Sequence, residues 1–222
     1  MFKTVDQKVC LELLPLHEYA GVDEKDPIKY YNLPIIGHMY QRRIELCLEE
    51  LSGGQSILEI GFGSGVSFLN LHKLYQEIYG LDLTADIQLI TNFFKSKNID
   101  VHLQNGNVLA MPYPDNSFDA ILLVSILEHL QPADQFKAFE EIKRVLKPGG
   151  QVVYGVPVER PFMVFMFRLL GTDIRKHHYS TEKDVYQTAL QFLKPVRIKK
   201  MSGPLKLFGS VYEVGQFQKI IS

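Results

Sequence analysis

The sequence contains little cysteine: Cys10 and Cys47 are the only two thiols in 222 residues. They do not have the spacing of metal ligands, and two cysteines cannot form the disulfide framework of a small secreted domain. We therefore expect no metal site, and we expect a reducing, cytoplasmic location.

The sequence also lacks an excess of charge of either sign. Its 24 lysines and arginines nearly balance 25 aspartates and glutamates, which gives a formal net charge of −1. A nucleic-acid-binding surface usually shows as a strong basic excess or a basic stripe. We expect no nucleic-acid partner, and the composition favours a small-molecule or lipid-like ligand instead.

Long hydrophobic runs are absent as well. No segment reaches the length that would cross a bilayer. Residues 1–8 carry a charge every few positions, which is unlike a secretory signal. A chain of 222 residues is long enough for one domain with a large core, with or without a small cap.

A glycine-rich loop is the most informative feature that the sequence does contain. Residues 57–65 read Ile-Leu-Glu-Ile-Gly-Phe-Gly-Ser-Gly, an apolar strand that runs into glycines at alternate positions. Glycines let the backbone turn sharply and let a ligand lie against bare peptide groups. A dinucleotide fingerprint would place its third glycine at position 66, where this chain has Val66. Nicotinamide and flavin cofactors are therefore disfavoured.

A strand, helix, strand unit is predicted around this loop. Residues 78–83 read as a second short strand, and the amphipathic stretch 66–76 predicts the connecting helix. Asp82 lies at the tip of that strand, where a carboxylate can accept both hydroxyls of a ribose. The alternative is that Asp82 only begins a turn or caps the next helix.

Further segments follow in a fixed order, and together with the loop they resemble the class I S-adenosylmethionine-dependent methyltransferases, with a domain similar to methyltransferase type 11. The resemblance covers about residues 40–157. It is carried by Glu59 with Gly61, Gly63 and Gly65, by Asp82, by Gly106-Asn107-Val108, and by residues 111–119, 125–130 and 141–150.

The resemblance implies a fold and a cofactor. It implies an α/β, doubly wound Rossmann-like seven-stranded sheet, mostly parallel with an antiparallel C-terminal strand, and helices on both faces. It implies an enzyme that binds S-adenosyl-L-methionine and releases S-adenosyl-L-homocysteine. The cofactor-binding residues expected from it are Glu59, Gly61, Phe62, Gly63, Gly65, Asp82, Leu83, Asn107, Val108 and Ser125.

Each polar group of this cofactor suggests a protein group that could bind it. Its carboxylate suits backbone N–H groups of the glycine loop and the following helix start, and Glu59 offers negative charge toward its ammonium. Many relatives carry an aspartate beside the adenine amino group, whereas this chain has Asn107, whose amide oxygen can still accept that hydrogen bond. The alternatives are an exposed strand-end acid for Glu59 and a plain turn residue for Asn107.

Two attachments to the cofactor domain are expected. Residues 1–50 read as an N-terminal helical lid whose clearest helix is 36–51, and residues 51–222 form the methyltransferase domain. Tyrosines in the lid, at positions 30, 31 and 40, could face the sulfonium of the cofactor, because aromatic faces attract cations. The alternative for each of them is ordinary core packing.

The second half of the chain predicts the remaining elements. We expect a helix over 132–146, a fifth strand over 151–156, a helix after Thr181 as N-cap with Asp184 in its first turn, and a closing antiparallel pair over 196–201 and 211–217.

A cap insertion is expected at about residues 157–180, longer than a usual connection. Its run 162–170 is apolar all round and would suit an acyl, prenyl or aromatic acceptor. A buried structural helix is the alternative, and a helix on a membrane surface is disfavoured because the run lacks a polar face.

Three histidines are candidate general bases: His129 after the fourth strand, and His177 and His178 in the insertion. Imidazole titrates near neutrality and can take a hydroxyl proton during attack on the methyl group. A base is needed only if the acceptor must lose a proton, and the sequence leaves open whether the accepting atom is O, N, C or S. For each histidine a packed or exposed role is the alternative.

The expected function is methyl transfer to a small-molecule, lipid-like or saccharide acceptor by in-line displacement. Two other functions remain open at this point: another enzyme of the same fold that uses S-adenosylmethionine differently, and a binding module without catalysis. The intact Glu59, glycines and Asp82 argue against a degenerate module. The acceptor and the oligomeric state are not decided by the sequence.

Overall fold

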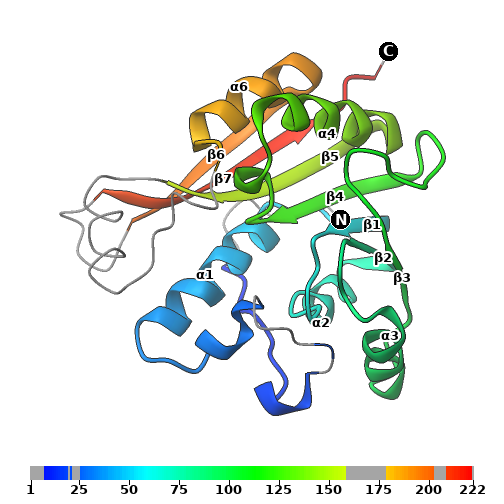
Figure 1. Cartoon of the computed structure of the whole chain (residues 1–222), viewed down its shortest axis with the longest axis vertical. Coiled ribbons are helices and arrows are strands. Elements are labelled where there is room, and N and C mark those ends of the chain that lie inside the picture. Colours follow the sequence, from blue (N-terminus) through cyan, green and yellow to red (C-terminus); the bar gives the residue numbers. More distant parts are fainter. Residues whose placement is uncertain (1–7, 20, 22–25, 159–178, 203–208, 222) are drawn as a thin grey trace.

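A seven-stranded mixed sheet forms the centre of the protein in the computed structural model, which describes residues 8–19, 21, 26–158, 179–202 and 209–221 (Figure 1). The strand order is β3-β2-β1-β4-β5-β7-β6, and β7 alone runs antiparallel to its neighbours. The fold class expected from the sequence is thereby confirmed. The strands are β1 (Gly54–Ile60), β2 (Tyr75–Asp82), β3 (Val101–Asn105), β4 (Phe118–Val124), β5 (Leu146–Pro157), β6 (Lys194–Ser202) and β7 (Ser210–Gln218).

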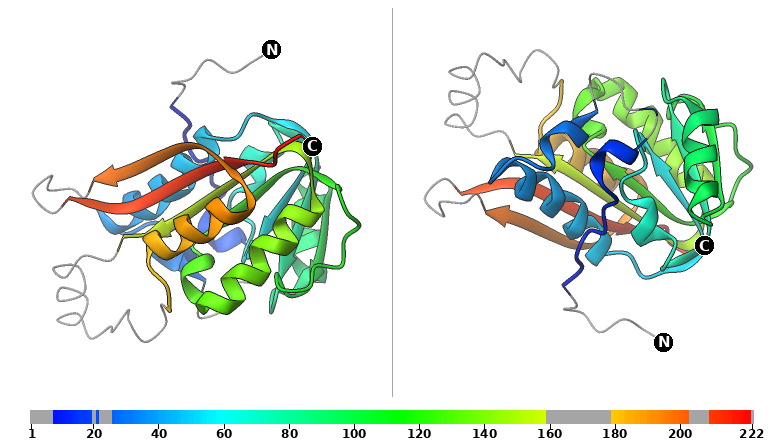
Figure 2. Two further views of the ribbon diagram at one scale, coloured as in Figure 1. Left: turned by 90° about the horizontal axis from the view of Figure 1, so that it is seen from above. Right: turned by 90° about the horizontal axis from the view of Figure 1, so that it is seen from below.

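Helices cover both faces of this sheet (Figure 2). One face is covered by α1 (Ile36–Glu49), α2 (Phe68–Leu71) and α3 (Ile87–Ser96), and the other by α4 (Pro132–Val145) and α6 (Glu182–Phe192). Short 3₁₀ turns η1 (Leu16–Glu18), η2 (Pro27–Tyr30) and η3 (Leu127–His129) complete the described elements. Among the described residues, no helix is both long and apolar enough to span a membrane.

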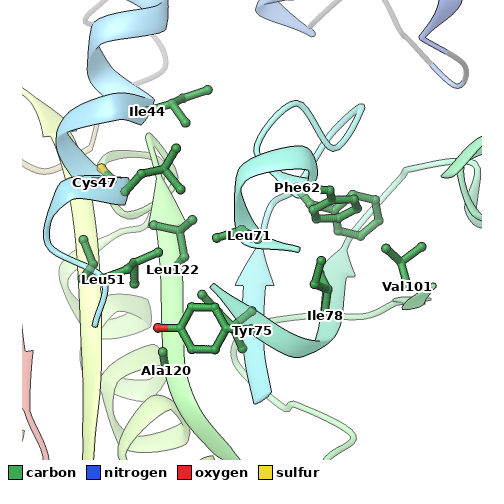
Figure 3. Close-up of a cluster of buried hydrophobic side chains, with 14 of the residues drawn as sticks. Ile44, Cys47, Leu51, Phe62, Leu71, Tyr75, Ile78, Val101, Ala120 and Leu122 are labelled. Atoms are coloured by element: carbon green, nitrogen blue, oxygen red, sulfur yellow. The ribbon is translucent and has the colours of Figure 1, made fainter. Parts of the chain in front are cut away.

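The central strands have a buried core on each face, because side chains alternate along a strand. Ile57 of β1 belongs to the cluster under α1, α2 and α3, whereas Leu58 and Ile60 belong to the cluster under α4 and α6. Figure 3 shows part of the first cluster, where Cys47 lies beside the strands. By the same alternation Glu59 faces the side of α1, α2 and α3.

Helix α1 packs closely on the sheet. Cys47 and Leu48 are fully buried, and a Cβ added at Gly155 of β5 would lie 2.8 Å from the Cys47 sulfur and 2.5 Å from the Tyr212 hydroxyl. A glycine at 155 therefore allows this close approach. The helix expected over 36–51 is confirmed as α1, which is part of the core, and the lid expected for residues 1–50 stays a prediction for the segment before it.

The helix expected over 66–76 is wrong. Only the single turn of α2 is helical, and β2 already begins at Tyr75, which pairs with Gly54. The reason is tertiary: Ser67 donates a hydrogen bond to Glu59, and the Asn70 side chain bonds the backbone of Cys10 and Glu12 at 3.0 and 2.9 Å. These buried polar contacts fix a tight turn where local spacing alone favours a helix.

The fifth strand is longer than expected. β5 begins at Leu146, directly after α4, and its pairing with β4 shifts register between Phe118 and Ala120. Residues 147–150, expected to separate helix from strand, therefore lie in the irregular start of β5, with Gly149 at a positive φ of 77°.

The closing elements agree with the sequence. The pair expected over 196–201 and 211–217 is confirmed as β6 and β7. Thr181 is the N-cap of α6, and it exchanges hydrogen bonds with Asp184, which completes a capping box.

Candidate functional site

The carboxyl ends of β1, β2 and β4 meet at one edge of the sheet, where open α/β sheets bind their ligands. The glycine loop lies at this edge and joins β1 to α2. Its three glycines have positive φ values of 73° (Gly61), 52° (Gly63) and 73° (Gly65), which only glycine adopts without strain.

Packing also demands glycine at two of these positions. A Cβ added at Gly65 would lie 2.7 Å from the Phe68 ring and 2.8 Å from the Phe94 ring. One added at Gly61 would lie 2.1 Å from the end of the Ile126 side chain. The loop is thus closely packed against its neighbours at these two glycines.

Four backbone N–H groups of the loop already have acceptors within the protein. The hydrogen bonds run from Gly61 to the Leu81 carbonyl (2.8 Å), from Gly63 to Asp82 Oδ2 (3.1 Å), from Ser64 to Asp26 Oδ2 (2.9 Å) and from Gly65 to the Phe62 carbonyl (2.8 Å). In addition, α2 has only four residues. The carboxylate site expected at the loop and helix start is therefore not offered by these groups.

Glu59 is a buried carboxyl group with 5% exposure at the end of β1. The Ser67 hydroxyl donates a hydrogen bond to its Oε2. Burial raises the pKa of Glu59 to about 8; the Ser67 hydrogen bond opposes this rise, and the nearby negative charge of Asp82 adds to it. Glu59 is therefore not the exposed strand-end acid of the alternative interpretation.

Asp82 has two structural tasks at the end of β2. Its Oδ1 accepts hydrogen bonds from the backbone of Thr84 (2.9 Å) and Ala85 (3.1 Å), which forms the turn that the sequence left as an alternative. Its Oδ2 accepts from Gly63 at 3.1 Å and so joins β2 to the glycine loop. A carboxylate has about four acceptor positions, so capacity for a ligand hydroxyl remains.

The other expected cofactor residues differ in how they face this edge. Leu83, directly after β2, is 70% exposed, whereas the Phe62 side chain is buried and packs on Phe68 with ring centroids 5.6 Å apart. Phe62 can therefore offer only backbone to a ligand. Asn107 is exposed and its Oδ1 accepts from Leu109 N at 2.9 Å, so it is a turn residue with one acceptor position left.

Arg144 of α4 holds the segment that contains Asn107 and Val108. Its guanidinium donates to the carbonyls of Met111 (2.9 Å) and Tyr113 (2.7 Å) and pairs with Asp115 (2.9 Å). Glu141 completes the network, because it pairs with Arg144 at 2.8 Å and accepts from Met111 N at 2.7 Å. No sequence pattern predicted this anchor, since its five residues from loop and helix meet only in the fold.

Asp26 is a second residue that the sequence analysis missed. It is buried, its Oδ2 accepts from Ser64 N at 2.9 Å, and its Oδ1 accepts from Ile28 N at 2.9 Å. The Asp-Pro step at 26–27 is a helix-start signal, and Asp26 is the N-cap of η2. Nothing in the sequence shows that the same carboxylate reaches the glycine loop.

Three tyrosines from the chain before β1 gather beside Asp26. Tyr40 stacks on Tyr30 with centroids 5.7 Å apart and meets Tyr31 at 6.0 Å. Burial raises the pKa of the Tyr31 phenol, and the charges of Asp26 and Glu59 act in the same direction. Tyr31 closes η2, whose N-cap Asp26 accepts from Ser64, so Tyr31 is the member of the cluster that is joined to the glycine loop.

Ser125 directly follows β4 at the same edge, with a positive φ of 56°. Its N–H donates to the Gly155 carbonyl at 2.8 Å, and its hydroxyl is hydrogen-bonded to the buried Tyr212 hydroxyl at 2.9 Å. His129, four residues further, is exposed in η3. His177 and His178 lie outside the described residues, as does the apolar run 162–170.

No group of three or more His, Cys, Asp and Glu side chains in the described part of the chain is arranged to hold a metal ion.

Comparison with known proteins identifies the family. Residues 58–154 match the family described as methyltransferase domain. The uncharacterized protein MJ0638 of Methanocaldococcus jannaschii is 30% identical over 171 residues, which cover 74% of this chain and 71% of that protein. A demethylmenaquinone methyltransferase of Tropheryma whipplei (strain Twist) is 28% identical over 165 residues, 68% of this chain and 67% of that protein.

The fold agrees with a solved member. The crystal structure of the N-methyltransferase NodS from Bradyrhizobium japonicum, in complex with S-adenosyl-L-homocysteine, matches with a TM-score of 0.66 and 17% identity and covers 91% of this chain and 96% of that one. This chain belongs to the class I S-adenosylmethionine-dependent methyltransferases. Its cofactor is S-adenosylmethionine. The carboxyl groups of Glu59, which is buried, and of Asp82, at the end of β2, are hydrogen-bond acceptors that fit the ammonium and the ribose of that cofactor, respectively.

Proposed function

We propose that this methyltransferase transfers the methyl group of S-adenosylmethionine to a small, lipid-like acceptor by in-line displacement. The observation that carries the proposal is the tyrosine cluster 30, 31 and 40, which η2 joins to the glycine loop through Asp26. Aromatic rings offer apolar contact area to an acceptor and attract a sulfonium.

We propose the following roles in cofactor binding, which the geometry of the edge supports. Asp82 binds the ribose hydroxyls with its remaining acceptor positions, and Glu59 receives the ammonium directly or through water. Asn107 accepts from the adenine amino group with its second lone pair, while Leu83 covers the nucleoside with its exposed side chain. Gly61, Gly63 and Gly65 let the cofactor approach the backbone, and Val108 and Ser125 border it.

The acceptor is assigned to the lipid-like class on two further grounds. The sequence run 162–170 is rich in phenylalanine and methionine, which suits an adaptable apolar wall. The Tropheryma whipplei relative is named for methylation of demethylmenaquinone.

The protein's own contribution to the reaction is positioning. The sulfonium activates the methyl carbon, and alignment of the acceptor atom behind it removes most of the remaining barrier. If the accepting atom is a hydroxyl oxygen, His129 takes its proton, since among the three candidate histidines it is the one that the described residues place after β4.

A binding module without catalysis is the second candidate function. The buried Glu59 argues only against a module that has lost its ligand, because a buried carboxyl group with a raised pKa lowers stability at neutral pH unless a cation compensates it. A chain that only retained the fold would gain stability by replacing this residue.

The proposal is tested in two stages on the full chain. Calorimetric titration with S-adenosylmethionine and with NAD, on the wild type and on Asp82→Ala, establishes the cofactor: we expect binding of S-adenosylmethionine alone, weakened about tenfold or more in the variant. Labelled methyl transfer is then measured to a prenylated demethylated quinone, to the same ring without its tail, and to a simple sugar. Faster transfer to the tailed acceptor supports the proposal. Cofactor binding without transfer to any acceptor favours the module, and preferred transfer to the sugar contradicts the lipid-like class.

A further inference from the structure

Arg43 of α1 has an unusual environment for a charged side chain. Its guanidinium lies over the ring of Tyr40 at 4.5 Å and over the ring of Tyr212 at 5.1 Å. Its Nε is buried without a hydrogen-bond partner. Among the described residues no carboxylate pairs with it. Burying a guanidinium donor in this way lowers stability unless a ligand supplies an acceptor.

The neighbouring Arg42 shows that carboxylates are plentiful on the same helix. Arg42 Nη1 pairs with Glu45 at 3.1 Å and with Glu49 at 2.7 Å. Arg43 lies on another side of α1, toward the tyrosines. The lack of a carboxylate partner for Arg43 within the described part of the chain is therefore a property of its location and not of the composition of the helix.

That location is the cofactor edge of the sheet. Tyr212 is hydrogen-bonded to Ser125 at the end of β4, and Tyr40 contacts Tyr31. The charges of both Arg43 and Glu59 act on the Tyr31 phenol. Tyr31 closes η2, and the N-cap of η2, Asp26, accepts from Ser64 in the loop that follows Glu59, so this cluster joins α1 to the end of β1.

The cofactor requires such a pair of charges. The ammonium and the carboxylate of S-adenosylmethionine are bonded to the same carbon atom, so the groups that receive them must be neighbours. Glu59 is proposed for the ammonium. The N–H groups of Gly61, Gly63, Ser64 and Gly65 are bonded within the protein, so a donor outside these four groups must bind the carboxylate.

We propose that Arg43 receives the carboxylate of the methionine part of the cofactor. A guanidinium presents its N–H groups in a planar fork that matches a carboxylate, and the two tyrosine rings hold that fork in place. The inference concerns cofactor binding and does not depend on the acceptor proposed above.

The test combines a change in the protein, at Arg43, with a change in the ligand, the removal of its carboxylate. Affinities of the full chain are measured by calorimetry for S-adenosylmethionine and for its decarboxylated analogue, with the wild type, Arg43→Gln, Arg43→Lys and the control Arg42→Gln. We expect Arg43→Gln to lose about ten- to a hundredfold in affinity for S-adenosylmethionine and less than about twofold for the analogue. Arg43→Lys should lie between, and Arg42→Gln should bind both ligands like the wild type.

If Arg43 has a purely structural role, Arg43→Gln should lose affinity for both ligands equally. This outcome, or an unchanged affinity of the variant for S-adenosylmethionine, would overturn the proposal. If Arg43→Gln does not fold, the affinities of the wild type for the two ligands provide the test. Equal affinities would show that the carboxylate has no strong partner in the protein and would overturn the proposal. Failure of this test leaves the methyl-transfer assay unaffected, so the two proposals are judged separately.

Discussion

The carboxylate of Asp26 accepts a hydrogen bond from the backbone N–H of Ser64 at 2.9 Å, across 38 positions of sequence. Asp26 also begins η2, the turn that leads to the tyrosine cluster. The glycine loop and the segment before α1 are therefore connected by one buried side chain. The conformation of the cofactor loop depends on a residue outside the region that resembles the family.

Replacing this carboxylate should loosen both segments. Asp26→Ala leaves the N–H groups of Ser64 and Ile28 without their acceptor, and each buried unsatisfied donor costs about 1–3 kcal/mol. We expect lower stability in urea unfolding and weaker binding of S-adenosylhomocysteine in calorimetry. Asp100→Ala, at an exposed position, is the control and should change neither quantity. Wild-type stability and affinity in Asp26→Ala would show that the contact does not hold the loop.

Cofactor binding should depend on pH through Glu59. Burial raises the pKa of Glu59 to about 8, so below that pH the carboxyl group must lose a proton before it can pair with an ammonium. We expect the affinity for S-adenosylhomocysteine to rise between about pH 6 and 8, with proton release visible as a buffer-dependent binding enthalpy. Glu59→Gln should bind more weakly, without this pH dependence. A flat profile for the wild type would contradict the assignment of the ammonium to Glu59.

The titration of Glu59 should also make the stability of the folded protein fall as the pH rises, whereas the affinity for the cofactor rises. The folded-state pKa of about 8 lies above the ordinary glutamate value of 4.5, so the folded protein binds more protons than the unfolded chain between these values. The contribution of Glu59 to the free energy of unfolding is therefore fully present below about pH 4.5 and is lost as the pH rises toward 8. We expect Glu59→Gln to be more stable than the wild type at pH 8 in urea unfolding, with the difference shrinking toward pH 5. An equal difference at both pH values would mean that Glu59 does not titrate in this range.

Packing of the glycine loop can be separated from its backbone strain. Gly65→Ala combines a positive φ of 73° with a Cβ 2.7 Å from the Phe68 ring, which together cost about 2–4 kcal/mol. Gly149→Ala is a matched control, because its φ of 77° is similar while the nearest atoms lie at 3.4 Å. We expect the first variant to lose at least about 1 kcal/mol more than the second in urea unfolding. Equal losses would show that the two phenylalanines move aside freely.

The sequence predicted the parts of the structure that local patterns determine. α1 and the pair β6 and β7 follow from the spacing of apolar residues, and the N-cap of α6 follows from Thr181 and Asp184. The glycine loop with Glu59 and Asp82 was identifiable because strand, turn and acid are adjacent in sequence.

The contacts that the sequence could not predict join distant segments. The helix expected over 66–76 is replaced by one turn because Ser67 and Asn70 bond to residues far along the chain. Asp26 at the loop and Arg43 between two tyrosines are likewise products of tertiary packing. No spacing rule relates these residues to the site, so only the fold brings them there.

Arg144 should influence cofactor binding from a distance, because it anchors the loop that carries Asn107. Arg144→Gln removes the donors to the Met111 and Tyr113 carbonyls and leaves the carboxylate of Glu141 without its cation. We expect a loss of about 2 kcal/mol in urea unfolding, since the network is partly exposed and solvent screens it.

The affinity for S-adenosylhomocysteine should fall together with that stability, because the released loop must be ordered again when the adenine binds. Lys137→Gln is the control on the same helix: its pair with Glu140 at 2.7 Å is exposed, so its removal should cost less than about 0.5 kcal/mol and leave affinity unchanged. A stability loss in Arg144→Gln with wild-type affinity would mean that the loop from 106 to 117 does not contact the adenine. Loss of both would place the α4 network among the elements that order the cofactor site.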